Sequence, residues 1–94
     1  MQDKEQTKNK RAMYKALAKI IQKHREAQNK SIYELAAVCS MSTNSWNRIE
    51  KGISLDPSFT TIWKIAEALD IYPDELIREV REKLGDDFSL SDLK

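Results

Sequence analysis

The stretch that most constrains the fold of this chain is Ser42–Gly52, which reads S-T-N-S-W-N-R-I-E-K-G. Serine is a preferred residue at the start of a helix, and glycine is the preferred residue just after a helix ends. The segment between them therefore predicts one short helix of about three turns. Trp46 and Ile49 are three residues apart, so they share one face of this helix and should point into a core.

The other faces of this helix carry small side chains that are rich in hydrogen-bond donors: Thr43, Asn44, Asn47 and Arg48. These residue types contact base edges and phosphates in protein–DNA complexes. The major groove of double-stranded DNA admits a helix of this kind. We therefore interpret residues 42–51 as a recognition helix that inserts into the major groove and that the rest of the chain supports.

Three of these side chains are candidates for base reading. Arg48 can pair with guanine O6 and N7, Asn44 can pair with adenine N6 and N7, and Thr43 can meet a thymine methyl group. The alternative for each residue is a phosphate contact or a solvent-exposed side chain.

Four further residues are candidates for phosphate contacts. Asn47 and Lys51 are expected to hold the DNA backbone rather than to read bases. Ser42, and Ser31 at the start of the preceding helix, can hold a phosphate together with the first helix amides. For both serines, the alternative is a helix cap with no DNA contact.

Composition and charge narrow the classes of function. The 94 residues fit one domain, and the scarcity of Gly and Pro, with two of each, favours helices over a turn-rich β fold. The net charge is +1, but residues 1–30 hold nine Lys/Arg against three Asp/Glu. An excess of positive charge in this N-terminal segment suits contact with phosphates. The alternative is that these charges only lie on solvated helix faces.

The sequence gives little support for an enzyme, a metal protein or a membrane protein. One cysteine and one histidine cannot supply the soft ligands of a zinc site, and no catalytic triad or glycine-rich phosphate loop is recognisable. We expect no enzyme activity, no metal and no cofactor. Without a signal peptide or a long apolar run, we expect a cytoplasmic protein that does not contact a membrane.

The region before the recognition helix predicts two helices. Residues 1–10 are polar and are expected to be a flexible tail or an extra helical turn, with a helix beginning near Lys10 and a domain spanning 11–84. The run S-I-Y-E at Ser31 is a capping box that starts the second helix. Leu35, Val38 and Cys39 are expected on its inner face. Two short helices joined by a tight turn make a helix-turn-helix.

The region after Gly52 predicts two more helices and a tail. Ser58 should cap the fourth helix, and Pro73 should open a fifth helix that ends at Gly85. Residues 85–94 form a tail with Phe88, Leu90 and Leu93 among acids and serines. This tail can be disordered, or can dock on its own domain or on a partner.

The run S-x-x-E-L-A-x-x-x-S-M-S-x-x-x-W-x-R-I-E-K-G resembles the helix-turn-helix of the Cro/CI-type (XRE) regulators, which include the phage repressors. The similarity extends upstream through L-A-K-I-I-Q-K-H-R-E-A-Q-N-K and downstream through D-P-S-F-T-T-I-W-K-I-A-E-A-L-D-I-Y-P-D-E-L. The resemblance implies an all-α fold, a five-helix lambda-repressor-like DNA-binding domain, here with an extended C-terminal helix and tail. It also implies a structural ion pair between Arg25 and Glu50.

The chain departs from the family pattern at several positions. Ile32 stands where the family usually has a glutamine that contacts DNA, which puts that contact in doubt. Ser40 and Asp70 stand where the family usually has glycine, and both must tolerate a left-handed backbone.

The function that we expect is sequence-specific binding of double-stranded DNA by a transcriptional regulator, most simply a repressor. One such module buries little surface, so we expect a homodimer on a two-fold site. The expected dimer surface is on the fifth helix, with Trp63 as a second candidate and packing within one chain as the alternative. The fifth-helix residues are Tyr72, Leu76, Ile77 and Val80.

Two alternatives remain open at this stage. The first is an antitoxin of this fold, whose acidic and apolar tail binds a toxin and which represses its own operon. The second is a protein–protein interaction module that has lost DNA binding, which Ile32 and the low net charge would favour.

Overall fold

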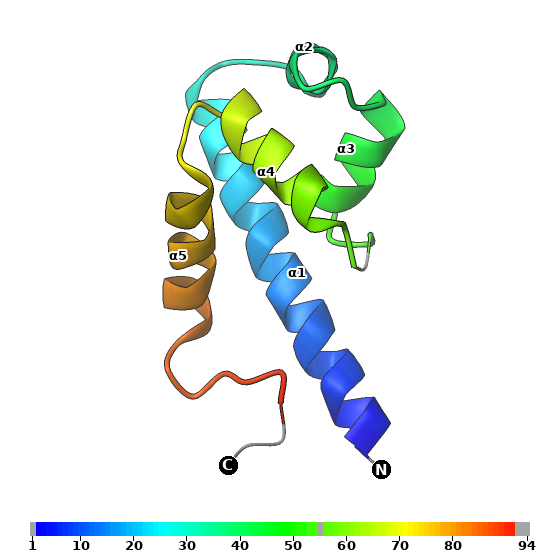
Figure 1. Cartoon of the computed structure of the whole chain (residues 1–94), viewed down its shortest axis with the longest axis vertical. Coiled ribbons are helices and arrows are strands. Elements are labelled where there is room, and N and C mark those ends of the chain that lie inside the picture. The colour runs from blue at the N-terminus through cyan, green and yellow to red at the C-terminus, as the bar shows by residue number, and fades with distance from the viewer. Residues whose placement is uncertain (1, 55, 92–94) are drawn as a thin grey trace.

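The computed structural model describes residues 2–54 and 56–91, and the side chains from residue 8 onward. Met1 and residues 92–94 of the expected tails, with Leu93 among them, lie outside this part. The described chain consists of helices and connecting loops and contains no strand, which confirms the predicted all-α class. The helices (Figure 1) are α1 (Gln2–Ala27), α2 (Ile32–Val38), α3 (Thr43–Glu50), α4 (Phe59–Ala68) and α5 (Pro73–Leu84).

The long helix α1 is the element against which α3 and α5 pack. It packs against α3 and α5, while α2 contacts α3 and α4, and α4 contacts α5. Figure 1 shows α1 running along the length of the molecule, with α5 on one side and α3 on the other. Each helix contributes to one core, whose fully buried large side chains are Trp46, Ile21, Leu35, Ile65, Leu69 and Leu76.

Helix α1 begins at Gln2, earlier than the start expected near Lys10. The first ten residues lack an apolar stripe, but Lys, Gln and Glu are good helix formers and can extend a helix that the core already holds. The added turns also contact other parts of the chain. Lys10 pairs with Asp56 at 3.1 Å, and the Asn9 side-chain amide donates to the Ser89 carbonyl at 3.0 Å.

The serine caps lie where the sequence predicts them. Ser31 accepts a hydrogen bond from the Glu34 amide, and Glu34 accepts one from the Ser31 amide, which completes the capping box. The hydroxyls of Ser42 and Ser58 accept from the amides three residues further on. These bonds fix the start of α2, α3 and α4 at single residues.

The helix ends use left-handed residues that are not glycine. Asn29, Ser40 and Asp70 have φ values of 59°, 57° and 61°. Ser40 forms the tight turn between α2 and α3, so the missing turn glycine does not prevent the helix-turn-helix. Gly52 also has a positive φ, and a Cβ there would lie 3.4 Å from Cγ of Lys15, so glycine allows α1 to approach this turn.

The inner face of α2 differs from the expected one at one position. Val38 is 71% exposed, whereas Ala36 is buried. The side chains that face the core follow an i, i+3, i+4, i+7 pattern that starts at Ile32 and ends at Cys39. Val38 is six residues after Ile32, so it lies outside the face that Ile32, Leu35 and Cys39 share.

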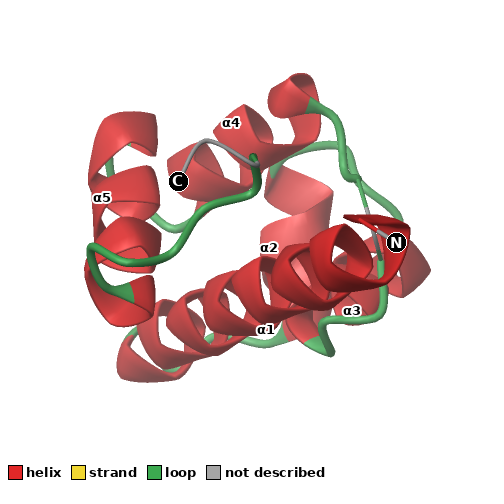
Figure 2. Cartoon of the chain, turned by 90° about the horizontal axis from the view of Figure 1, so that it is seen from below, coloured by secondary structure: helices red, strands yellow, loops and turns green. Residues whose placement is uncertain are grey.

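The chain after α5 returns to its own domain. Figure 2 shows this segment running back across the end of the molecule from α5. Phe88 is half-buried, and the Ser89 carbonyl accepts the hydrogen bond from Asn9 on α1. Residues 85–91 of the tail therefore dock on their own domain, which is one of the alternatives that the sequence left open.

His24 joins α1 to α5 through Glu79, a contact that the sequence analysis did not anticipate. The His24 Nε2 atom lies 3.0 Å from a Glu79 carboxylate oxygen, and both side chains are 20% exposed. Burial raises the pKa of Glu79, but the hydrogen bond and charge of His24, with Lys23, outweigh it and hold this pKa below its ordinary value.

Replacement of Glu79 by glutamine should test this link. Because the folded-state pKa is depressed, the carboxylate stabilises the fold above its unfolded pKa of about 4.3, and this stabilisation disappears as the pH falls through the folded value. Glu79→Gln should therefore lower the free energy of unfolding by about 1 kcal/mol at pH 7, and by less at pH 3.5. Urea unfolding at both pH values measures the difference.

Glu82→Gln, at an exposed position on the same helix, is the control and should change stability little at either pH. A Glu79→Gln deficit of the same size at pH 7 and pH 3.5 would show that the charge of Glu79 is not the cause.

Candidate nucleic-acid interface

Helix α3 has two faces with different surroundings. Trp46 is fully buried and Ile49 is 5% exposed, so these two side chains hold the helix against the core. Thr43, Asn44 and Arg48 are exposed. The face that carries the proposed base-reading residues is therefore open to a ligand, and the face that anchors the helix is closed.

The residues expected to contact phosphates lie along α3 and at the start of α2. Asn47 is half-buried, and Lys51 is exposed at the C-terminal cap of α3. Ser42 and Ser31 are exposed at the N-caps of α3 and α2, where their hydroxyl oxygens already accept from helix amides. A DNA contact by these four residues remains a prediction.

Arg25 and Glu50 form a buried ion pair that ties α1 to α3. The Arg25 Nη2 atom lies 2.6 Å from Oε1 of Glu50, and Arg25 Nε donates to Oε2 at 2.9 Å. The two side chains are only 16% and 6% exposed. The hydrogen bonds to Glu50 raise the pKa of Arg25, despite the opposing effect of burial.

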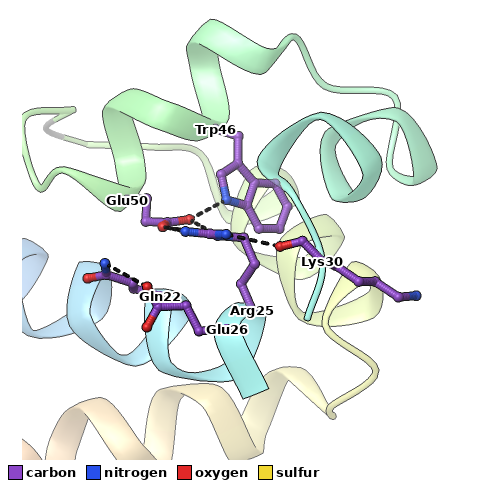
Figure 3. Close-up of polar contacts among 6 residues, drawn as sticks. All are labelled: Gln22, Arg25, Glu26, Lys30, Trp46 and Glu50. Carbon is purple, nitrogen blue, oxygen red and sulfur yellow. Dashed lines mark hydrogen bonds and ion pairs between the residues drawn. The ribbon is translucent and has the colours of Figure 1, made fainter. Parts of the chain in front are cut away.

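Two further contacts extend this pair into a network (Figure 3). The Trp46 Nε1–H group donates to Oε2 of Glu50 at 2.8 Å, and Arg25 Nη1 donates to the Lys30 carbonyl at 3.0 Å. The network therefore joins α1, α3 and the segment that leads into α2. The bond from Trp46 was not among the predicted contacts, although the spacing of four residues on one helix places Trp46 and Glu50 together.

Removal of Glu50 should destabilise the protein strongly. Glu50→Ala leaves the Arg25 guanidinium and the Trp46 indole without their acceptor in a desolvated site, at an expected cost of about 3–5 kcal/mol. A double-mutant cycle with Arg25→Ala, measured by urea unfolding, should show strong coupling.

The exposed pair of Lys10 and Asp56 provides the matched control cycle. Its side chains are 39% and 66% exposed, so its coupling should be about 0–1 kcal/mol. Additive effects at Arg25 and Glu50, within about 0.5 kcal/mol, would contradict a structural role for the buried pair.

The departure at residue 32 has a structural explanation. Ile32 is half-buried and packs against the core cluster. An apolar side chain at the first position of α2 therefore contributes to packing. Because Ile32 packs toward the core, the proposed base reading is left to the exposed surface of α3.

The expected dimer surface divides into two groups. Tyr72 and Ile77 are 75% and 49% exposed, whereas Leu76 and Val80 are 0% and 7% exposed. The assignment of Leu76 and Val80 to a dimer surface is therefore corrected, because α5 turns these two side chains into its own core. Ile77 lies beside these two residues on the helix surface, at the edge of the buried face, and is half-exposed.

An apolar groove lies beside Ile77, between α4 and α5. It has a volume of about 540 Å³. Phe59 and Trp63 form one wall, with their rings in an edge-to-face contact at 5.9 Å. Arg78 and Arg81 lie on the α5 side of the groove. We call this surface, made of Phe59, Trp63, Asp74, Ile77, Arg78 and Arg81, the α4–α5 face.

Comparison with protein families gives a match to the helix-turn-helix family over residues 21–76. The chain belongs to the Cro/CI-type (XRE) helix-turn-helix family. The matched segment runs from the second half of α1 to Leu76 and includes the whole helix-turn-helix. No curated protein and no solved structure gives a significant match. The family membership makes this chain a DNA-binding helix-turn-helix regulator.

Among the described residues, no three side chains of His, Cys, Asp or Glu come together as metal ligands would. None of the helices in that part of the chain combines the length and apolar character that spanning a membrane requires.

Proposed function

We propose that this protein represses transcription by binding a specific operator as a homodimer, with α3 inserted into the major groove. The observation that carries the proposal is the division of α3 into a buried face and an exposed face. Thr43 and Asn44 would read bases from the first turn of the helix, which is where recognition helices contact base edges. A dimer that occupies a promoter blocks it by steric exclusion alone.

The α4–α5 face supports the proposed dimer. Residues 74, 77, 78 and 81 are spaced as one stripe on α5 and read Asp, Ile, Arg and Arg. When two such stripes meet in antiparallel fashion about a two-fold axis, Asp74 of each copy faces Arg81 of the other. The same contact would cover the exposed rings of Phe59 and Trp63. Charge and apolar surface are therefore both self-complementary.

Selection of bound DNA from a random pool is the experiment that tests the function. We expect one enriched motif made of two inverted half-sites, about 34 Å or a multiple of it apart. Affinity should fall steeply with salt, because phosphate contacts release counterions. Absence of binding even at low salt would contradict the proposal and favour the interaction module that has lost DNA.

Two asparagines of α3 provide a matched pair of variants. Asn44→Ala should relax base preference at one position of each half-site, by about 1–3 kcal/mol of discrimination. Asn47→Ala, at the expected phosphate contact, should weaken binding to all sequences equally. Competition binding against a set of single-base operator variants measures both effects. Unchanged base preference in Asn44→Ala would remove this residue from the reading surface.

The dimer surface can be tested with a charged side chain. Ile77→Lys should shift the protein from dimer to monomer in sedimentation experiments, because it removes an apolar contact and places a cation opposite Arg78 of the other copy. Val38→Lys changes another β-branched apolar residue, which is more exposed and lies on α2, outside the α4–α5 face, and should leave the dimer intact. A dimer that survives Ile77→Lys unchanged would exclude this face as the interface.

A further inference from the structure

A second cavity lies beside the recognition helix, between α3 and α4. It has a volume of about 370 Å³ and lies next to the turn that precedes α3. Its lining is mostly polar, with Ser42 and Ser45 at the start of α3, and Thr61 and Lys64 on α4. Arg48 also lines it, and this side chain belongs to the exposed face of α3 as well.

The charge of this cavity has one sign. Arg48 and Lys64 both line it, and no carboxylate does. Within the described residues, neither of these two cations has a hydrogen bond or an ion pair, in contrast to Lys10, Lys23 and Arg25. Lys64 is also half-buried, and no carboxylate lines the cavity with it.

The acidic side chains near the cavity are engaged elsewhere. Glu50 accepts from Arg25 and Trp46, and Asp56 accepts from Lys10. Glu67, one turn beyond Lys64 on α4, accepts from the indole of Trp63. With two cations and no carboxylate in its lining, the cavity favours an anion.

Hydroxyl groups complete the donors of the cavity. The Ser42 hydroxyl donates to the Ser45 hydroxyl oxygen at 2.8 Å, so the hydrogen of Ser45 is left for another acceptor. Thr61 adds a hydroxyl from α4, which shares a hydrogen bond of 2.9 Å with the Ser58 hydroxyl, where either group can be the donor. A tetrahedral anion with several acceptor oxygens suits such a mixture of guanidinium, ammonium and hydroxyl donors.

We infer that this cavity binds a phosphate group of the DNA backbone, held by Arg48 from α3 and by Lys64 from α4. The inference rests on the proposed function. The cavity opens beside the surface that meets DNA, because Arg48 and Ser42 belong to both. Arg48 is then a phosphate contact rather than a reader of guanine, and base reading falls to Thr43 and Asn44. Lys64 becomes a DNA contact outside the helix-turn-helix.

Salt-dependent DNA binding tests this assignment. Lys64→Gln and Arg48→Gln should each weaken binding to the selected operator and to unrelated DNA by the same factor, about tenfold at 0.1 M salt. Each should lower the slope of log affinity against log salt by about one, because one phosphate contact is lost. Base preference, measured on single-base operator variants, should stay the same.

Two controls keep the result interpretable. Lys64→Arg retains the charge and should keep the slope of the wild-type protein, and circular dichroism checks that every variant is folded. Lys83→Gln removes an exposed charge near the C-terminal end of α5, away from the cavity, and should keep the wild-type slope.

Different outcomes would contradict the cavity assignment and the proposed function. A wild-type protein that binds its operator, with Lys64→Gln equal to it in affinity and slope, overturns the cavity assignment and leaves the function standing. A changed base preference in Arg48→Gln without a change of slope overturns it too. Failure of the wild-type protein to bind DNA at low salt overturns the function itself.

A free phosphate ion could bind the same donors as a phosphate of the DNA backbone. A separate titration distinguishes the two ligands. Inorganic phosphate is added to the wild-type protein and to Lys64→Gln, and the amide signals of residues 42–64 are followed by nuclear magnetic resonance. Weak binding in the millimolar range or none, with the DNA effects above, supports the backbone phosphate. Tight binding that depends on Lys64, with DNA binding unaffected by Lys64→Gln, overturns it in favour of a free ligand.

Discussion

The buried pair of Arg25 and Glu50 is the interaction on which the rest of the structure depends. Because the carboxylate is almost completely removed from water, its position is dictated by the guanidinium and the Trp46 indole that donate to it. Arg25 also holds the Lys30 carbonyl, just before α2 begins. One network therefore sets the orientation of α3 relative to α1, and the exposed face of α3 follows from that orientation.

The cations of the chain divide by whether they have partners in the fold. Arg25 is paired in a buried site, and Lys10 and Lys23 are paired near the surface with Asp56 and Glu79. These pairs connect α1 to α3, to the loop before α4 and to α5. Arg48 and Lys64 lie instead at a cavity without a carboxylate. A small net charge of +1 is compatible with DNA binding, because two cations can share a local site that holds no carboxylate, as Arg48 and Lys64 do.

Much of the fold was predictable because its signals are local. The capping serines act on amides three residues away, and the apolar stripes of α1 and α4 repeat with the period of a helix. The left-handed positions at Asn29, Ser40 and Asp70 follow from the same short-range chemistry. The N-terminal boundary of α1 was less predictable, since its first turns gain support from Asp56 and Ser89, which are distant in the sequence.

The sequence by itself determined that this protein is a helix-turn-helix whose third helix lies near residues 42–51, because caps, spacing and apolar period act within a few residues. Only the tertiary structure decided which apolar residues of α5 face inward, since Leu76 and Ile77 are equally apolar and differ only in what packs against them. It also brought Lys64 beside Arg48 and His24 beside Glu79. Such contacts depend on how helices cross, and no short stretch of sequence contains that information.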